Sequence, residues 1–386
     1  MNNPQRESPS YLGENREVPE EYFIGLLSGT SIDSIDAAIF TFGGEDCQLI
    51  ATHNHAIPPS LRSQLVQAAQ CDQFGIDELG SLDAQFGELL AEAVQTLLAS
   101  TDLPAERISA VGSHGQTIRH RPNLTPRFTW QIGDPTRIVE RTGITTVADF
   151  RRRDMAAGGE GAPFAPLFHQ FKFADPNESR AVINIGGIAN ITILPGDPAQ
   201  QIVGFDCGPG NLLMDGWIEK HRSLPFDHHG EWGLSGKVDP GLLQHLLGID
   251  YFELSPPKST GRELFNMEWL ARHLAGFSAL RTEDVQATLL EFTAASIATS
   301  LLKQNPDCQR ALVCGGGSHN KGLMKRLESL LGIPTESTVL HGLSPDWVEA
   351  ATFAWFARRA LRREPTGTPP ITGASHSVVL GAIYPA

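Results

Sequence analysis

The sequence lacks the features of several broad protein classes. It has no C-x-x-C pair and an odd number of scattered cysteines, which indicates reduced thiols in a cytoplasmic protein. No apolar run approaches the roughly 20 residues of a membrane-spanning helix. Its 30 Lys and Arg residues against 44 Asp and Glu residues give a formal net charge of −14. This balance disfavours nucleic acids and anionic membranes as partners, because both need a basic face. The cysteines are Cys47, Cys71, Cys207, Cys308 and Cys314.

Four familiar catalytic motifs are also missing. The chain contains no G-x-x-x-x-G-K-[ST], no H-E-x-x-H, no G-x-S-x-G and no well-placed G-x-G-x-x-G. The P-loop, zincin, α/β-hydrolase and Rossmann classes therefore lose support. A phosphate ligand, if there is one, must be held by backbone amides, a metal ion or a few cations.

What is present fits a soluble, loop-rich α/β protein of two lobes. The chain has 386 residues, 38 of them Gly and 26 Pro, and 41% of them are hydrophobic. We interpret residues 1–21 as a flexible polar tail. Residues 22–150 together with 366–386 form the first predicted lobe, and residues 151–365 form the second.

A first strand–turn–strand unit runs through residues 23–40. Its turn carries backbone amides, hydroxyls and two carboxylates, which could bind phosphate oxygens and the waters of a Mg²⁺ ion held by Asp33 and Asp36. An ordinary polar hairpin tip is the alternative for this stretch taken alone. The candidate residues are Gly29, Thr30, Ser31, Ile32, Asp33, Ser34, Ile35 and Asp36.

A second hairpin has two glycines at its tip, where two β-branched runs meet. Gly186 and Gly187 have no Cβ, so a ligand could contact backbone N–H groups there, and Asn190 follows closely. The next run ends at Asp206 and passes through Gly208 and Gly210 into an amphipathic helix. A carboxylate at a strand end beside a helix N-terminus makes Asp206 the first catalytic candidate. Cys207 has no obvious base nearby and is interpreted as an apolar filler.

A third glycine-rich turn follows a short strand near residue 314. Gly315, Gly316 and Gly317 would let a flat ligand lie against the backbone, and Asn320 stands near the start of the next helix. This arrangement suits a nucleotide base or ribose. Further on, a helix from Ser344 through Arg363 has alanines at 350, 351, 354 and 357, which permit close packing.

Polar side chains gather at the carboxyl ends of two predicted strands, where open α/β sheets bind ligands. Four hydrogen-bonding residues in one loop favour a polar small molecule such as a sugar, although a lone histidine is more often structural. Asp149 and the arginines 151–153 form a dense charged cluster, which we interpret as a phosphate or carboxylate site, with Arg151 its candidate ligand and solvated charge the alternative. Residues 258–263 are a candidate second anion site. The sugar-loop candidates are Ser113, His114, Gln116, Thr117 and Gln131.

Six short segments in combination resemble the anhydro-N-acetylmuramic acid kinase family. The resemblance covers residues 22–386 and implies a two-lobed actin-like ATPase fold, with ribonuclease H-like α/β domains and a central nucleotide cleft. It implies an ATP-dependent kinase that opens 1,6-anhydro-N-acetylmuramic acid with water and yields N-acetylmuramic acid 6-phosphate, in cell-wall recycling. The segments are 27–36 (LSGTSIDSID), 112–117 (GSHGQT), 147–154 (VADFRRRD), 184–190 (NIGGIAN), 205–211 (FDCGPGN) and 313–317 (VCGGG).

Residue roles follow from the same resemblance. Residues 29–36 match the ATP-binding turn, and Asp206 matches the general base. Ser34 stands where the family usually has glycine. We expect the sugar between the lobes, contacted by the 113–117 loop, Gln131, Asp149, Gly208 and Gly210, with Arg151 or a neighbouring arginine on its carboxylate.

Two other functions remain open. An ordinary hexose or amino-sugar kinase would use Asp206 to deprotonate a sugar hydroxyl. An actin- or Hsp70-like ATPase would act through partner binding, without any sugar. Acidic two-lobed metabolic enzymes are often homodimers, and a homodimer is left open here.

Overall fold

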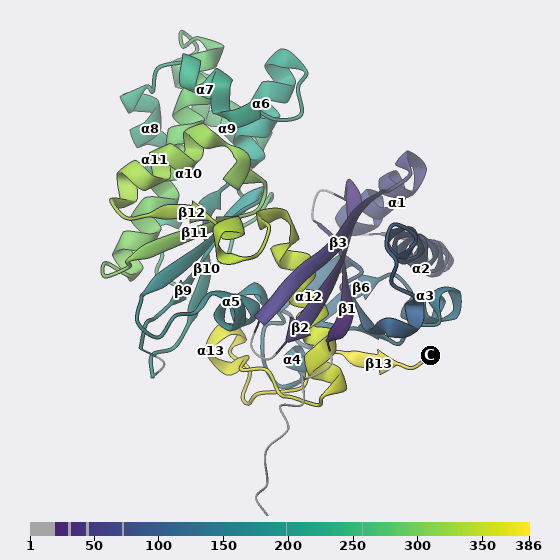
Figure 1. The fold of residues 1–386 in the computed structure, drawn as a ribbon. Helices are drawn as coiled ribbons and strands as arrows, with labels where there is room; N and C mark the ends of the chain where they lie inside the picture. Colours follow the sequence, from purple (N-terminus) through teal and green to yellow (C-terminus); the bar gives the residue numbers. More distant parts are fainter. Residues whose placement is uncertain (1–19, 30–31, 44–45, 72, 198, 257) are drawn as a thin grey trace, which may run out of the picture.

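The computed structural model describes residues 20–29, 32–43, 46–71, 73–197, 199–256 and 258–386. Nearly all of the predicted tail, and Thr30 and Ser31 of the first turn, lie outside these ranges. Two central sheets, each covered by helices, dominate the fold (Figure 1). The prediction of a mixed α/β fold is confirmed.

The first sheet has six strands in the order β13-β7-β4-β1-β2-β3. β1 and β2 form the predicted antiparallel hairpin, in which Ser28 pairs with Ile35, and β1 lies parallel to β4. The C-terminal strand pairs with β7 at the far edge. The strands are β1 (Glu21–Ser28), β2 (Ser34–Gly43), β3 (Asp46–Ala56), β4 (Ile108–Ser113), β7 (Thr146–Ala148) and β13 (Ala382–Tyr384).

The second sheet has five strands in the order β10-β9-β8-β11-β12. Its strands β8 and β9 form the second predicted hairpin, and β11 lies parallel to β8. A separate two-stranded sheet, β5 (Gln116–Arg121) and β6 (Phe128–Ile132), follows β4. The strands of the second sheet are β8 (Arg180–Ile185), β9 (Ile188–Leu194), β10 (Val203–Pro209), β11 (Arg310–Cys314) and β12 (Thr335–Ser337).

Helices cover the outer face of each sheet and pack by apolar faces into separate cores. On the first sheet these are α1 (Pro59–Gln70), α2 (Ile76–Ala99) and α3 (Pro135–Thr142). On the second sheet they are α6 (Leu212–Arg222), α7 (Glu231–Ser235), α8 (Pro240–Leu247), α9 (Met267–His273), α10 (Thr282–Gln304) and α11 (Lys321–Leu331). Figure 1 shows the α6–α11 group at one end of the molecule and α1–α3 at the other.

A third core joins the inner faces of the two sheets. It contains residues of both sheets together with α4 (Phe150–Ala156), α5 (Ala165–Phe173) and α12 (Val348–Leu361), and α13 (Pro369–Thr372) lies beside it. The two halves of the molecule are therefore joined by shared packing, with α5 and α12 between them. The division at residues 150 and 365 stays a prediction.

Helix α12 lies directly on the first sheet because two glycines remove the side chains between them. A Cβ on Gly25 would come within 1.9 Å of the Ala350 carbonyl oxygen, and one on Gly112 within 2.1 Å of the Phe353 carbonyl oxygen. The alanines at 350, 351, 354 and 357 are all buried. The prediction that these alanines permit close packing is confirmed. A bulkier residue at Gly25 or Gly112 would push the helix off the sheet.

Helix α10 is the one helix in the described part of the chain with the length and composition of a membrane span. Of its apolar window, 78% is buried inside the fold. It packs against α7, α8, α11 and β10, so its apolar character is accounted for by the core of the second half.

Candidate functional site

Asp206 lies on the edge strand β10 and is partly open to solvent. The loop that follows α8 holds it through three hydrogen bonds. The Thr260 N–H donates to Oδ2 of Asp206 at 3.0 Å, and the Asp206 N–H donates to the Lys258 carbonyl at 3.2 Å. The Tyr251 hydroxyl donates to the Asp206 carbonyl oxygen at 2.7 Å. These bonds fix the backbone and one carboxylate oxygen in place.

The environment of Asp206 makes it a stronger base than an ordinary aspartate. Burial raises the pKa of Asp206 to about 6, and the charge of Glu263 adds to the rise, while the Thr260 N–H lowers it. A carboxylate with a pKa near the working pH is well matched to proton abstraction, because it is both ionised and basic. The arrangement can therefore remove a proton from water or a hydroxyl group.

Asp206 belongs to a row of polar residues that crosses the second sheet. It pairs with Asn190 on β9, which pairs in turn with Asn184 on β8. Paired residues on neighbouring strands point to the same face, and strands lie about 4.8 Å apart, so the row spans about 10 Å. The row lies beside the glycine-tipped hairpin that connects β8 to β9.

The tip of this second hairpin is joined to the start of α6. The carbonyl of Gly186 accepts the Asn211 N–H at 2.8 Å, and that of Gly187 accepts the Gly210 N–H at 2.9 Å. A Cβ on Gly187 would meet no atom closer than Leu212 Cβ at 3.9 Å. The side of Gly187 where a side chain would stand is thus open, which suits close approach of a ligand.

Two nearby glycines have a packing role. A Cβ on Gly210 would lie 2.3 Å from the Gly186 carbonyl oxygen. Gly208 has φ +143, and a Cβ there would meet Phe252 at 3.0 Å. Contact of either glycine with a sugar stays a prediction.

The third glycine turn packs against the same hairpin. A Cβ on Gly315 would lie 2.5 Å from Asn184 Oδ1, and one on Gly317 would lie 2.3 Å from a side-chain carbon of Ile185. Gly316 is more open, with its nearest neighbour at 3.6 Å. Asn320 caps α11 by accepting the Leu323 N–H at 3.0 Å, so its side-chain oxygen is already used.

The backbone of the first turn shows what the serine at position 34 does to its conformation. Ser34 begins β2 and is not among the residues with positive φ, whereas Ile32 has φ +56. A serine in place of the family's glycine at position 34 therefore causes no backbone strain of the left-handed kind. Ile32 and Ile35 are buried, so only their backbone could contact a phosphate.

The two carboxylates of this turn lie in different surroundings. Asp33 is exposed and forms an ion pair with Arg62 at 2.8 Å. Asp36 accepts a hydrogen bond from Asn54 at 2.5 Å. Burial raises the pKa of Asp36 to about 6, and the charges of Glu349 and Asp346 add to the rise. Asp36, unlike Asp33, thus faces other carboxylates.

The described residues include no group of three or more His, Cys, Asp or Glu side chains that could hold a metal ion by themselves. Mg²⁺ bound to a nucleotide does not require such a group, since it usually keeps several waters and takes one or two carboxylates besides the phosphates. Asp36 and Glu349 are the candidates for this role, because the charge of Glu349 acts on Asp36.

The sugar loop at the end of β4 contains buried polar atoms without partners. Among the described residues, Ser113 Oγ, Gln116 Oε1 and Gln131 Oε1 have no hydrogen-bond partner. Gln131 instead uses its amide nitrogen on Thr117 at 3.1 Å. Buried polar groups are normally hydrogen-bonded, so a cluster of unpaired ones indicates a place for a polar ligand.

The buried His114 and the half-buried Arg151 form a hydrogen-bonded pair beside this loop. The Arg151 guanidinium donates to Nε2 of His114 at 2.9 and 3.1 Å and to the Gly161 carbonyl at 2.8 Å. Burial and the charge of Arg151 lower the pKa of His114 to about 3, so its ring is neutral and Nε2 accepts. Arg151 thus has a structural partner, while two of its five N–H groups remain for a ligand. Its neighbour Arg152 pairs with Asp149 at 3.2 Å.

Glu349, which the sequence did not single out, connects these segments. It stands in the first turn of α12 and accepts a hydrogen bond from Asn184 at 3.2 Å. Its charge acts on both Asp36 and Arg151. Surrounding protein atoms raise the pKa of Glu349, although the side chain still reaches solvent. No local sequence signal identifies it, because its partner Asn184 lies 165 residues away along the chain.

Cysteine chemistry has no part in this geometry. All five cysteines are free, as predicted. Cys207 is fully buried, and its thiol donates to the Ala189 carbonyl at 3.2 Å. Burial raises the pKa of Cys207 far above its ordinary value. A buried, protonated thiol is a poor nucleophile.

The comparisons with known proteins agree with the resemblance seen in the sequence. A family model described as "Anhydro-N-acetylmuramic acid kinase" matches residues 21–386. A protein of that name from Xanthomonas campestris pv. campestris (strain 8004) is 51% identical over 369 residues, which cover 94% of this chain and 97% of the relative. One from Shewanella baltica (strain OS185) is 49% identical over 366 residues, with coverage of 95% and 99%.

Solved structures show weaker likeness. Component A of (R)-2-hydroxyglutaryl-CoA dehydratase from Acidaminococcus fermentans matches with a TM-score of 0.47 and 12% identity, covering 87% of this chain and 97% of that one. A score below 0.5 does not by itself establish a shared fold.

These matches define a phosphotransferase that acts on an alcohol group. The chain belongs to the anhydro-N-acetylmuramic acid kinase family, and the predictions of a kinase and of the family are confirmed.

Proposed function

We propose that this chain uses ATP and water to convert 1,6-anhydro-N-acetylmuramic acid into N-acetylmuramic acid 6-phosphate and ADP, during cell-wall recycling in the cytoplasm. The observation that carries the proposal is the state of Asp206. Its carboxylate is anchored through one oxygen, partly open to solvent, and has a pKa raised to about 6.

In this reaction the oxygen that bridges C1 and C6 of the anhydrosugar loses its bond to C1 and gains a bond to phosphorus. Asp206 takes a proton from water, whose oxygen attacks the anomeric carbon of the anhydrosugar. The bond from that carbon to the bridging oxygen breaks, and the bridging oxygen, still attached to C6, accepts the γ-phosphoryl group of ATP. One general base and a site that binds the triphosphate are then sufficient for the reaction, because phosphoryl transfer depends mainly on positioning and charge stabilisation.

The triphosphate would lie between the first turn and the second hairpin. Gly29 and Gly187 supply backbone without crowding, since a Cβ on Gly29 would meet nothing within 4 Å in the described structure and one on Gly187 would meet an atom only at 3.9 Å. The open Gly316 turn would take the adenosine. Mg²⁺ would be held by Asp36 and Glu349, where it would neutralise phosphate charge. Asp33, paired with Arg62, is the weaker candidate.

The sugar would lie against the first half of the molecule. The unpaired oxygens of Ser113, Gln116 and Gln131 would accept or share hydrogen bonds with its hydroxyl and amide groups. The two remaining N–H groups of Arg151 would bind its carboxylate. The charge of Glu349 acts on both Arg151 and Asp36, which supports a sugar subsite beside the phosphate subsite.

The test is release of ADP by the purified protein with Mg²⁺ and ATP. We expect release only with 1,6-anhydro-N-acetylmuramic acid, and not with N-acetylglucosamine or glucose. Turnover of ATP with ordinary hexoses would favour a hexose or amino-sugar kinase instead. Turnover that no sugar changes would favour an actin-like ATPase and would contradict the proposal.

A further inference from the structure

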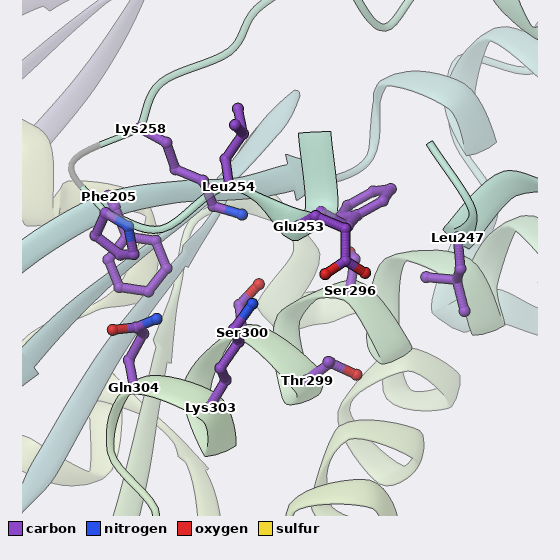
Figure 2. Close-up of a pocket in the computed structure, with 12 residues that line it drawn as sticks. Phe205, Leu247, Glu253, Leu254, Lys258, Ser296, Thr299, Ser300, Lys303 and Gln304 are labelled. Atoms are coloured by element: carbon purple, nitrogen blue, oxygen red, sulfur yellow. The ribbon is translucent and has the colours of Figure 1, made fainter. Parts of the chain in front are cut away.

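A cavity of about 170 Å³ lies on the far side of β10 from the Asp206 carboxylate. Successive side chains of a strand point to opposite faces, so Phe205 enters this cavity while Asp206 faces the other way. The remaining walls come from the C-terminal half of α10 and from the loop after α8 (Figure 2). None of the residues proposed above for ATP or sugar lines it.

The cavity concentrates positive charge in a protein whose net charge is −14. Lys258 and Lys303 line it together with a single carboxylate, Glu253. Within the described part of the chain, neither lysine forms an ion pair. Burial and the nearby charge of Lys303 lower the pKa of Lys258. Figure 2 shows both side chains reaching toward the cavity, Lys258 from the loop and Lys303 from α10.

The other polar groups of the cavity suit an anion, and the apolar groups suit a small carbon skeleton. Thr299, Ser300 and Gln304 offer hydroxyl and amide donors along α10, while Phe252 and Leu254 form an apolar side. The volume corresponds to about five or six water molecules. It can hold one phosphate group with a few attached atoms. Lys258 and Lys303 less the carboxylate of Glu253 give the lining a charge of +1, which attracts a phosphate monoester of charge about −1.5 to −2 at pH 7.

The loop that forms one wall is the same loop that holds Asp206. Tyr251 and the backbone of Lys258 and Thr260 make the three hydrogen bonds to Asp206, at 2.7, 3.2 and 3.0 Å. Lys258 also donates to the Tyr251 carbonyl at 3.3 Å and lies 4.6 Å from the centre of the Tyr251 ring. An anion that attracts the Lys258 ammonium group therefore shifts the loop whose hydrogen bonds hold Asp206, the proposed base.

The geometry points to a second ligand site between Lys258 and Lys303, which binds a small phosphate-bearing metabolite and changes turnover through Tyr251, Lys258 and Thr260. The binding part stands on the cavity alone. The effect on turnover rests on the proposed role of Asp206. The site differs from the subsites for ATP and sugar, since it lies behind β10.

The test uses inorganic phosphate as the probe. The full-length protein is first saturated with Mg²⁺ and a non-hydrolysable ATP analogue, so that the triphosphate site is filled, and phosphate is then titrated by calorimetry at constant ionic strength. Lys258→Gln and Lys303→Gln should each weaken binding about tenfold, as expected for loss of one charged hydrogen bond. Lys325→Gln, at an exposed lysine of α11, is the matched control and should bind like the wild type.

A second arm measures turnover. Phosphate should change kcat of the wild type and of Lys325→Gln at the same concentrations, and the same change should need about tenfold more phosphate in Lys303→Gln. Lys303 makes none of the three hydrogen bonds to Asp206. Absence of phosphate binding, equal binding in all four proteins, or binding that leaves turnover unchanged would each overturn the inference. The calorimetry measures phosphate affinity without any sugar or turnover. It therefore tests the binding site even if the chain does not catalyse the proposed reaction.

Discussion

The two central sheets present different chemistry where they face each other. At the end of the first sheet, Ser113 on β4, together with Gln116 and Gln131 of the adjoining two-stranded sheet, offers buried polar atoms that the described residues leave unpaired. At the end of the second sheet, Asp206 offers a carboxylate with a pKa of about 6 beside a hairpin with an open glycine tip. The difference suggests a division of labour, in which the first half recognises the sugar and the second half supplies the base and much of the phosphate grip.

The largest expected effect is on the second sheet. Asp206→Asn keeps the size of the side chain but removes the base, and should lower kcat about 10³-fold or more while ATP affinity changes less than about twofold. Steady-state kinetics and nucleotide titration measure both.

The matched control for this variant is Asp215→Asn on α6, where burial raises the pKa of Asp215 to about 7. It should retain activity. A fully active Asp206→Asn enzyme would contradict the assignment of the base.

Gly187→Val tests the phosphate grip on the same sheet. The new side chain would meet no protein atom closer than 3.9 Å at its Cβ, so the fold should tolerate it. It would occupy the space proposed for the triphosphate. KM for ATP should rise about 10- to 100-fold, because hydrogen bonds from backbone N–H groups to the charged phosphate oxygens are lost. Gly367→Val, also uncrowded, should have normal kinetics. Unchanged ATP kinetics in Gly187→Val would mean that this hairpin does not face the nucleotide.

Ser113→Ala tests recognition on the first sheet. The hydroxyl has no partner among the described residues, so its removal should leave the melting temperature unchanged. KM for the anhydrosugar should rise about tenfold, because a hydrogen bond to the ligand is lost. Thr41→Val removes another buried, unpaired hydroxyl on β2 and should leave KM alone. If both variants behave alike, Ser113 does not contact the sugar.

The pH dependence of the rate should follow Asp206. Since its pKa is about 6 and the base must be ionised, kcat/KM should be level above pH 7 and fall about tenfold per pH unit below 6. If an ordinary aspartate were the base, kcat/KM would begin to fall only near pH 4. That result would mean that the base is a residue other than Asp206.

The smallest effect is on stability. The folded-state pKa of Asp206 lies above the unfolded value of 3.8, so its charge destabilises the fold at neutral pH. Asp206→Asn should therefore raise the free energy of unfolding by about 1–3 kcal/mol above pH 6. The gain should fade as the pH drops from 6 toward 4, where the carboxyl is protonated in the folded state and about half protonated in the unfolded state. Denaturant unfolding at pH 7.5 and pH 4 measures the difference.

Local elements were predictable from the sequence because their signals are local. The two glycine-tipped hairpins and the strand–glycine–helix unit at 310–331 form as expected. Asp206 could be chosen because a carboxylate between a strand and a glycine-rich turn is visible in one segment.

Contacts between distant segments were not predictable. The Arg151–His114 pair spans 37 residues and changes how much of the guanidinium a ligand can use. Glu349 reaches Asn184 across 165 residues, and no local pattern distinguishes it from a surface acid. The pairing of Asp33 with Arg62 depends on where α1 packs. The last two features depend on where α12 and α1 pack in the fold.

The most direct test of the central claim is the reaction in water enriched in heavy oxygen. If Asp206 activates water for attack on the anomeric carbon, each product molecule should carry one heavy oxygen at C1 and none in the newly transferred phosphoryl group. The unmodified sugar product, incubated alone in the same water, corrects for exchange at C1. Product that forms with no heavy oxygen at C1 beyond this correction, or with heavy oxygen in the phosphoryl group, would contradict the account.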